Sequence, residues 1–388
     1  MKTSAFVYPW DVNGDPDAAR RIADLGVRQV TLAAAYHSTR ALTPRHPRHR
    51  VVTAEHASVL YPVDEQRWEG RELRPYAAGD WAPADAYGEA AAALAAAGLD
   101  VHTWVVLAHN SRLGAEHPDT SVVNAYGDRY PWAPCIAQPA TRAYLVGLAA
   151  EAATRPGARG TELESLGWYG LAHLHAHDKT AGVGLGEAGQ YLMSLCFCAD
   201  CRTGYGQHGL DADELARAVR AALEPVWRGE ATDDGWPTVE KLLGAEPAAA
   251  TRAHRDATAR SLQEAAVAAV REAAPDGFQV LLHADPVSYH CGANAGVDPA
   301  HILSVADGVV VPCTGGAALV GPFARAGKAA KVVAANFTVV RGMGGSPHTL
   351  AADARAARDL GATELRLYHA GLASDTDLDT VREALAQL

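Results

Sequence analysis

The residues of this chain that could do chemistry are most concentrated between Thr161 and Cys201. The segment opens with a short apolar stretch that carries two carboxylates, passes through alternating histidines and closes with a tight group of cysteines. Carboxylates serve as general acids and bases, imidazoles bind ligands or metals, and clustered thiols hold soft metal ions. The residues concerned are Glu162, Glu164, His173, His175, His177, Cys196, Cys198 and Cys201.

The three cysteines have the spacing C-x-C-x-x-C, which predicts a zinc site. Zinc takes four ligands in a tetrahedron, so a fourth is needed. Cys135 is our first choice, and Cys291 and Cys313 are alternatives that follow later strands. A site closed by four thiolates has no open position for a substrate, so we expect the zinc to be structural.

Glu162 and Glu164 lie two residues apart on a predicted strand and therefore face the same way. Glu164 is nearer the carboxyl end of the strand, where we expect it to act as a general acid. Glu162 is a weaker candidate for a catalytic role. The alternative is that both belong to a solvated or salt-bridged pair.

Several glycines flank the segment that carries the histidines, which indicates a loop. We expect His173 and His175 to bind substrate through hydrogen bonds. A second metal site and an exposed polar loop are the alternatives that this pattern leaves open.

Eight short apolar segments alternate with helical ones along the chain, which predicts parallel strands joined by long crossovers. Eight such units favour a (β/α)8 barrel with its site at the carboxyl ends of the strands. The competing doubly wound sheet lacks its glycine fingerprint after the first strand. The predicted strands are Ser4–Trp10, Val27–Tyr36, Asp100–Ala108, Thr161–Gly167, Phe278–Asp285, Asp307–Pro312, Lys331–Val339 and Thr363–His369.

We interpret residues 1–388 as a single barrel domain. Long loops are expected after the second, third and fourth strands, and residues 205–275 read as a helical insertion before the fifth. A glycine-rich loop, Arg341–Thr349, follows the seventh strand, where barrels often bind phosphate.

The predicted strand ends carry aromatic rings, imidazoles and amides, which suit a polyhydroxylated ligand such as a sugar. We expect substrate contacts from Trp10, Asp11, Tyr36, His37, His109, His283, Asn336, Tyr368 and His369. Asp285 ends the fifth strand next to the fourth, so it is our choice for the carboxylate that assists Glu164.

The composition excludes several classes of protein. A 48% hydrophobic fraction supports a large core, and a formal net charge of −11 argues against nucleic acid and anionic membranes as partners. No signal peptide and no membrane span are expected, and we expect a cytoplasmic protein. A homo-oligomer is compatible with these numbers.

The cysteine pattern also supports a family resemblance. A cysteine in a loop before a helix (Cys135), a strand ending in Glu164 and the segment CFCADC are similar to the zinc-bearing β-galactosidases of glycoside hydrolase family 42. The resemblance extends to uncharacterised barrel proteins grouped with glycosyl hydrolases and covers about seventy residues. It implies a structural zinc on Cys135, Cys196, Cys198 and Cys201, and an acid at Glu164.

The chain departs from that family in two places. Leu163 stands where those enzymes have asparagine, and the strand Lys331–Val339 has no glutamate to act as nucleophile. We therefore expect an enzyme that resembles a glycoside hydrolase, acts on a small sugar or glycoside, and inverts the anomeric centre. The alternative is a barrel that binds or isomerises a sugar or sugar phosphate without glycosidase activity.

Overall fold

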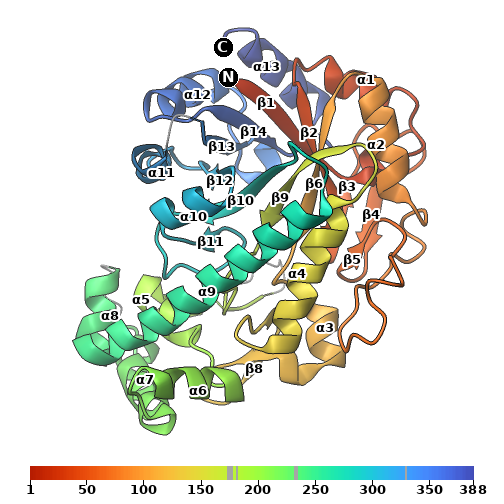
Figure 1. Cartoon of the computed structure of the whole chain (residues 1–388). Coiled ribbons are helices and arrows are strands. Elements are labelled where there is room, and N and C mark those ends of the chain that lie inside the picture. The colour runs from red at the N-terminus through yellow and green to blue at the C-terminus, as the bar shows by residue number, and fades with distance from the viewer. Residues whose placement is uncertain (173–177, 181, 231–234, 328–329) are drawn as a thin grey trace.

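The computed structural model describes residues 1–172, 178–180, 182–230, 235–327 and 330–388. Eight parallel strands close into a barrel surrounded by helices (Figure 1), which confirms the predicted (β/α)8 architecture. The barrel strands are β1 (Lys2–Val7), β2 (Gln29–Tyr36), β6 (Asp100–Val106), β9 (Ala158–Glu164), β10 (Gln279–Asp285), β12 (Gly308–Pro312), β13 (Val332–Thr338) and β14 (Glu364–Tyr368).

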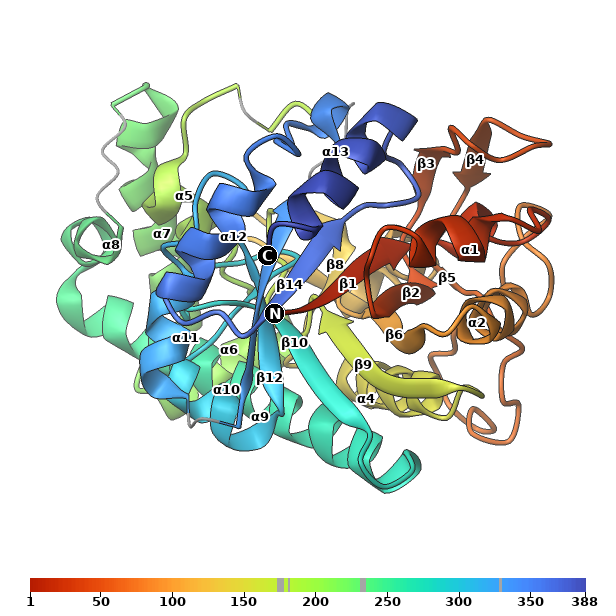
Figure 2. The ribbon, with the colours of Figure 1, turned by 90° about the horizontal axis from the view of Figure 1, so that it is seen from above.

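The barrel closes because β1 pairs with β2 on one side and with β14 on the other. Seen from above, these three strands lie side by side (Figure 2). The strands read as apolar runs because both faces are covered, one by barrel side chains and one by helices. Every residue of β2 is buried, for example.

The first and the fourth predicted strands differ most from the structure in their bounds. The first ends at Val7 instead of Trp10, because Pro9 cannot donate to a strand ladder and Pro9–Asp11 forms a 3₁₀ turn. The fourth runs from Ala158 to Glu164 and stops three residues earlier than expected. Ser165 follows with a φ of 58°, a left-handed conformation that takes the chain out of the strand.

The predicted long loops are present and carry secondary structure of their own. The loop after β2 folds into a hairpin and a short strand, and the loop after β6 into a helix and a second hairpin. Their elements are β3 (Thr39–Leu42), β4 (Val51–Ala54), β5 (Ser58–Val59), α3 (Ser111–Glu116), β7 (Ser121–Val123) and β8 (Arg129–Pro134), and β11 (Ala295–Gly296) adds to β10.

Helices cover the outside of the barrel. Those outside the insertion are α1 (Ala18–Ala23), α2 (Ala86–Ala96), α4 (Pro139–Ala153), α10 (Pro299–Val305), α11 (Val320–Ala326), α12 (Leu350–Asp359) and α13 (Asp375–Leu385). Among the described residues, none of the helices is long and apolar enough to cross a membrane.

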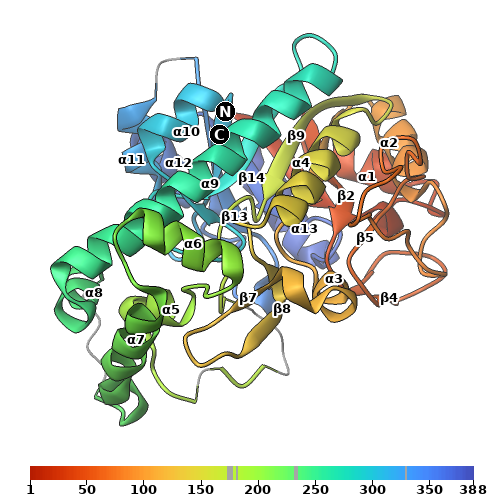
Figure 3. The same ribbon diagram turned by 60° about the horizontal axis from the view of Figure 1, so that its bottom comes forward.

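The chain between β9 and β10 is helical, as expected for the insertion. Its helices are α5 (Gly186–Met193), α6 (Ala199–Gln207), α7 (Ala212–Trp227), α8 (Trp236–Leu243) and α9 (Ala245–Ala273). The long helix α9 runs beside α4 and returns the chain to the barrel, while α5 to α8 gather at its far end (Figure 3). The insertion thus forms a wall next to the carboxyl ends of β9 and β10.

Candidate active site at the barrel mouth

Glu164 is the last residue of β9, at the carboxyl end of the barrel. Its side chain is 12% exposed, so the carboxylate reaches solvent from a largely buried position. The Trp104 indole donates a hydrogen bond of 2.7 Å to Glu164 Oε2, and His283 Nδ1 lies 3.9 Å from the same oxygen. The structure therefore places a carboxylate where barrel enzymes carry out catalysis.

Glu162 lies on the same face of β9 but is fully buried. Arg366 Nε donates to its Oε1 at 2.8 Å, and Arg366 also donates to Glu364 at 2.8 Å. Burial alone would raise the pKa of Glu162, but Arg366 and His283 lower it to about 2. Glu162 is therefore an ionised partner for a buried guanidinium inside the barrel.

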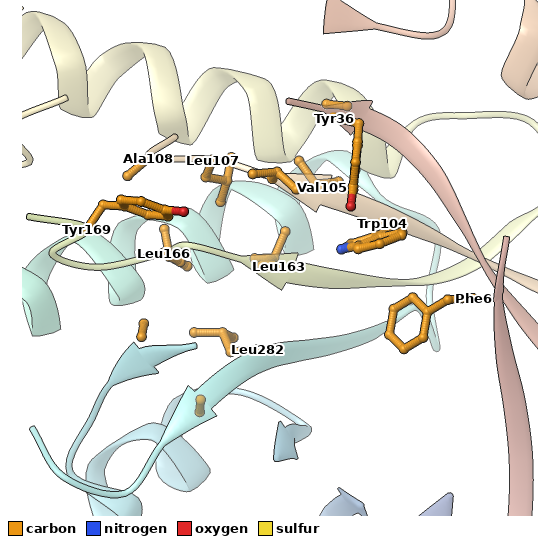
Figure 4. Packing of buried hydrophobic residues seen from close by; sticks show 14 of the residues in the cluster. Phe6, Tyr36, Trp104, Val105, Leu107, Ala108, Leu163, Leu166, Tyr169 and Leu282 are labelled. Carbon is orange, nitrogen blue, oxygen red and sulfur yellow. The ribbon is translucent and has the colours of Figure 1, made fainter. Parts of the chain in front are cut away.

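Aromatic side chains form the wall beside Glu164. The Trp104 ring lies between Phe6 and Tyr36, at centroid distances of 4.7 and 4.6 Å (Figure 4). The Tyr8 hydroxyl donates to the Tyr36 hydroxyl at 3.1 Å. Burial raises the pKa of both phenols well above the usual range, so they stay protonated as hydrogen-bonding groups.

The residues expected to contact substrate fall into two groups, one at the strand ends and one behind the aromatic wall. His37, Asn336 and Tyr368 are half-buried at the ends of their strands. Two others, Asp11 and His369, lie behind the wall.

Asp11 Oδ2 accepts a hydrogen bond of 2.8 Å from the Tyr8 backbone N–H and lies 3.9 Å from His369 Nδ1. His369 is fully buried, and its ring contacts that of Tyr8 at 4.2 Å. Both residues support the aromatic wall from behind.

Of the other predicted contacts, Trp10 is buried against Tyr8, at a ring distance of 4.7 Å. His109 stacks on Tyr169 with ring centroids 4.3 Å apart and planes within 6°. His283 bridges the two glutamates of β9. His173 and His175 lie outside the described residues.

A cavity of about 330 Å³ opens between the insertion and the loop after β10. Asp285 lies in its lining with Glu187, Tyr169 and His290. Asp285 Oδ1 accepts a hydrogen bond of 2.8 Å from the Val287 backbone, and Oδ2 lies 3.0 Å from His290 Nδ1. The predicted second carboxylate thus faces a cavity large enough for a small ligand.

Tyr169 lines this cavity and stacks on His109. Burial first, and then the charge of Glu164, raise the pKa of the Tyr169 phenol above its usual range. Sequence reasoning missed Tyr169, Glu187 and His290 as site residues. The one available signal was position, because His290 follows the strand end at Asp285 by five residues.

Four cysteine thiols meet beside the mouth. The Sγ atoms of Cys135, Cys196, Cys198 and Cys201 all lie within 4.8 Å of one another. Cys135 Sγ is 3.6 Å from both Cys198 Sγ and Cys201 Sγ, and no disulfide joins them.

The surroundings of the four thiols fit a metal. The backbone N–H groups of Val123 and Cys198 each donate to Cys196 Sγ at 3.5 Å, as to a thiolate. Four convergent thiols are the donor set that tetrahedral zinc prefers. The alternative ligands Cys291 and Cys313 lie elsewhere: Cys291 Sγ accepts from Arg255, and Cys313 Sγ contacts the Val311 carbonyl.

Comparison with known proteins gives a fold class. Neither a protein-family model nor a curated protein sequence matches the chain. Among solved structures, one match is α-L-fucosidase isoenzyme 2 from Paenibacillus thiaminolyticus. The match covers 100% of this chain and 49% of the fucosidase chain, with 11% sequence identity and a TM-score of 0.59. The catalytic domain of β-amylase from Paenibacillus polymyxa matches 99% of this chain and 97% of its own, with 13% identity and a TM-score of 0.58.

The family 42 β-galactosidase Gan42B from G. stearothermophilus matches 100% of this chain and 56% of its own, with 11% identity and a TM-score of 0.56. The chain therefore spans about half the length of the fucosidase and of this β-galactosidase. At these identities the likeness shows the fold, which is the barrel found in glycoside hydrolases. The resemblance predicted from the cysteine pattern is thus confirmed as a partial structural match.

Proposed function

We propose that the protein is a glycoside hydrolase that acts on a small sugar or glycoside at the barrel mouth, with Glu164 as general acid. The observation that carries this proposal is the position of Glu164 at the end of the fourth barrel strand. There it is partly exposed, oriented by Trp104 and flanked by aromatic rings. A carboxylic acid so placed can protonate the oxygen of a leaving group.

Asp285 is the proposed base that activates water. Its Oδ1 accepts a hydrogen bond from the Val287 N–H and its Oδ2 lies 3.0 Å from His290 Nδ1, so the carboxylate is held in the lining of the cavity. In the family that the sequence resembles, the strand that corresponds to β13 supplies the nucleophile, but β13 has the sequence VVAANFT and contains no carboxylate. The pair of Glu164 and Asp285 therefore favours inversion over a covalent intermediate.

A panel of aryl and alkyl glycosides tests the role of Glu164. Glu164→Gln is expected to lower turnover by about 10²–10⁴-fold on poor leaving groups. The loss should be much smaller on dinitrophenyl glycosides, whose leaving groups need no proton. Glu272→Gln, an exposed glutamate in α9, is the matched control and should be fully active. Equal turnover by Glu164→Gln and the unsubstituted protein on alkyl glycosides would remove Glu164 from the mechanism.

The first-formed anomer tests the role of Asp285. Proton NMR of a reaction in progress is expected to show the inverted anomer first, and Asp285→Asn should lose most of the activity. If Asp285 were instead a nucleophile, the unsubstituted protein would release the retained anomer first, and azide would rescue Asp285→Asn as the glycosyl azide of inverted configuration. These two results together would contradict the assignment of Asp285 as base.

The four-thiol cluster is the proposed site of one structural zinc, held by Cys135, Cys196, Cys198 and Cys201. The metal would tie the loop after β6 to the insertion and so brace one side of the mouth. Elemental analysis of protein prepared without added metal should give about one zinc per chain. Cys198→Ser is expected to lower zinc content and melting temperature together, whereas Cys313→Ser should keep the zinc. A folded, metal-free protein with unchanged melting would contradict this assignment.

One observation favours a second candidate function. β13 has no carboxylate, and the Oδ1 of Asn336 near its end is buried without a hydrogen-bond partner among the described residues. A barrel that binds or isomerises a sugar or sugar phosphate would not need a carboxylate there. Sugar binding by calorimetry, together with no turnover of any glycoside in the panel, would support this alternative.

A further inference from the structure

His290 is bracketed by two carboxylates from different parts of the chain. Its Nδ1 lies 3.0 Å from Asp285 Oδ2 at the end of β10, and its Nε2 lies 3.4 Å from Glu187 Oε2 in the first turn of α5. All three residues line the 330 Å³ cavity. An imidazole placed between two acids joins the insertion to the strand that carries the proposed base.

Glu187 is itself held in place. The Tyr289 hydroxyl donates to its Oε2 at 2.7 Å, and Tyr289 in turn lies under the guanidinium of Arg252 from α9. The Asp285 carboxylate has the Val287 N–H on one oxygen and His290 on the other. Each end of the chain Glu187–His290–Asp285 is therefore fixed by a contact outside it.

We propose that His290 is a positioning residue, which Glu187 and Asp285 hold between them so that the Asp285 carboxylate faces the cavity as a base. This inference rests on the proposed function. It deepens that function, because it adds two residues, from the insertion and from the loop after β10, to the hydrolytic site. The arrangement also explains why a helical insertion lies against the end of β10.

The charge state of His290 gives the arrangement a pH dependence. Burial lowers the pKa of His290, but Asp285 and then Glu187 raise it above the ordinary value overall. The other charged or titratable groups nearby are Tyr289 and Cys291 in its own loop, and Arg252 and Asp256 of α9, which contact Ser288. His290 is therefore an imidazolium below its raised pKa, and as pH rises through that value the ring loses one proton and can no longer donate to both carboxylates. Activity should fall on the alkaline side with the same midpoint.

Two variants and one matched control test this inference. His290→Gln should lower kcat by about tenfold with little change in KM, because it loosens Asp285, whereas the loss of a substrate contact would raise KM. Glu187→Gln should move the alkaline limb of kcat/KM to lower pH. His301→Gln is the control, since His301 lies 3.4 Å from Glu264 in a similar pair outside the cavity. Its kinetics and alkaline limb should match those of the unsubstituted protein.

NMR titration of the His290 imidazole measures the same pairing without turnover. Its midpoint should lie above that of a histidine in a model peptide and should fall in Glu187→Gln and in Asp285→Asn. In an enzyme that hydrolyses glycosides, an unchanged midpoint in both variants, or an unchanged kcat in His290→Gln, would overturn this inference alone. Absence of turnover by the unsubstituted protein would overturn the proposed function, and with it the kinetic role of His290.

Discussion

Two glutamates on one strand have opposite surroundings. Glu162 is fully buried and accepts a hydrogen bond from the Arg366 guanidinium, whereas Glu164, two residues further along β9, is partly exposed and accepts one from the neutral Trp104 indole. His283 lies between them, 3.6 Å from Glu162 and 3.9 Å from Glu164. Burial alone would raise the pKa of Glu162, but the guanidinium of Arg366 lowers it to about 2, so Glu162 is ionised at neutral pH. The two glutamates share their residue type and their face of the strand, so their partners and their exposure are what distinguish them.

The largest expected effect comes from removing the buried member of this pair. Glu162→Gln leaves the fully buried Arg366 with only Glu364 as a carboxylate partner among the described residues. The loss of one partner of a buried ion pair costs about 3–5 kcal/mol. Glu164→Gln should change the free energy of unfolding by less than ~1 kcal/mol, since its surroundings include no buried cation. Urea unfolding of the two variants measures both changes in the free energy of unfolding. Equal changes in the two variants would contradict the difference proposed between Glu162 and Glu164.

The same contrast predicts how acid acts on the protein. The pKa of Glu162 is lowered from 4.5 to about 2, so its contribution to stability is present above pH 4.5 and is lost as pH falls towards 2. Linkage puts the contribution at roughly 3 kcal/mol. Urea midpoints measured at pH 7, 4 and 3 should fall more steeply for the unsubstituted protein than for Glu162→Gln. Parallel pH dependences of the urea midpoint for the two proteins would show that Glu162 does not contribute this pH-dependent stability.

Much of this arrangement could be predicted from the sequence, because its signals are local. Apolar runs indicated the eight strands, and the two-residue period of a strand put Glu162 and Glu164 on one face. The cysteine spacing singled out the cluster, and Cys135 could be proposed as a fourth member because few other thiols were available.

Long-range contacts left no such signal. Arg366 reaches Glu162 across 204 residues of chain, and Glu187 meets His290 only because the insertion folds back onto the loop after β10. The interior pairing of Glu162 and the bracketing of His290 could therefore not be predicted. Asp11 and His369 were expected at the mouth on the basis of strand ends, but the turn at Pro9 places Asp11 behind Tyr8.

Asp11 extends the comparison, because it is a buried carboxylate that forms no salt bridge with lysine or arginine among the described residues. Burial raises its pKa from 3.8 to about 7, so the cost of ionising it in the folded protein appears as pH rises through that range. Asp11→Asn removes this cost and can still accept the Tyr8 N–H. Relative to the unsubstituted protein, its free energy of unfolding should rise by roughly 2–3 kcal/mol between pH 5 and pH 8.

This pH dependence of the free energy of unfolding has the opposite sign to the one expected for Glu162, whose contribution to stability is lost in acid. Asp375→Asn is the control: it removes the exposed carboxylate that lies 4.0 Å from Arg45, the cation whose charge also acts on Asp11. It should show no change between the two pH values. A flat difference for Asp11→Asn would contradict the assignment of Asp11 as a buried, readily protonated acid.

The smallest expected effect concerns the hydrogen bond that orients Glu164. Trp104→Phe removes the indole N–H while a ring remains to contact Phe6 and Tyr36. A net hydrogen bond of about 1 kcal/mol corresponds to roughly a fivefold fall in kcat on poor leaving groups. Trp68→Phe is a close match, since Trp68 also donates to a buried carboxylate, Glu151, at 2.8 Å, but away from the mouth. Both variants should lose similar stability, and only Trp104→Phe should lose turnover. Equal kinetics in the two would show that Glu164 does not depend on Trp104 for its orientation.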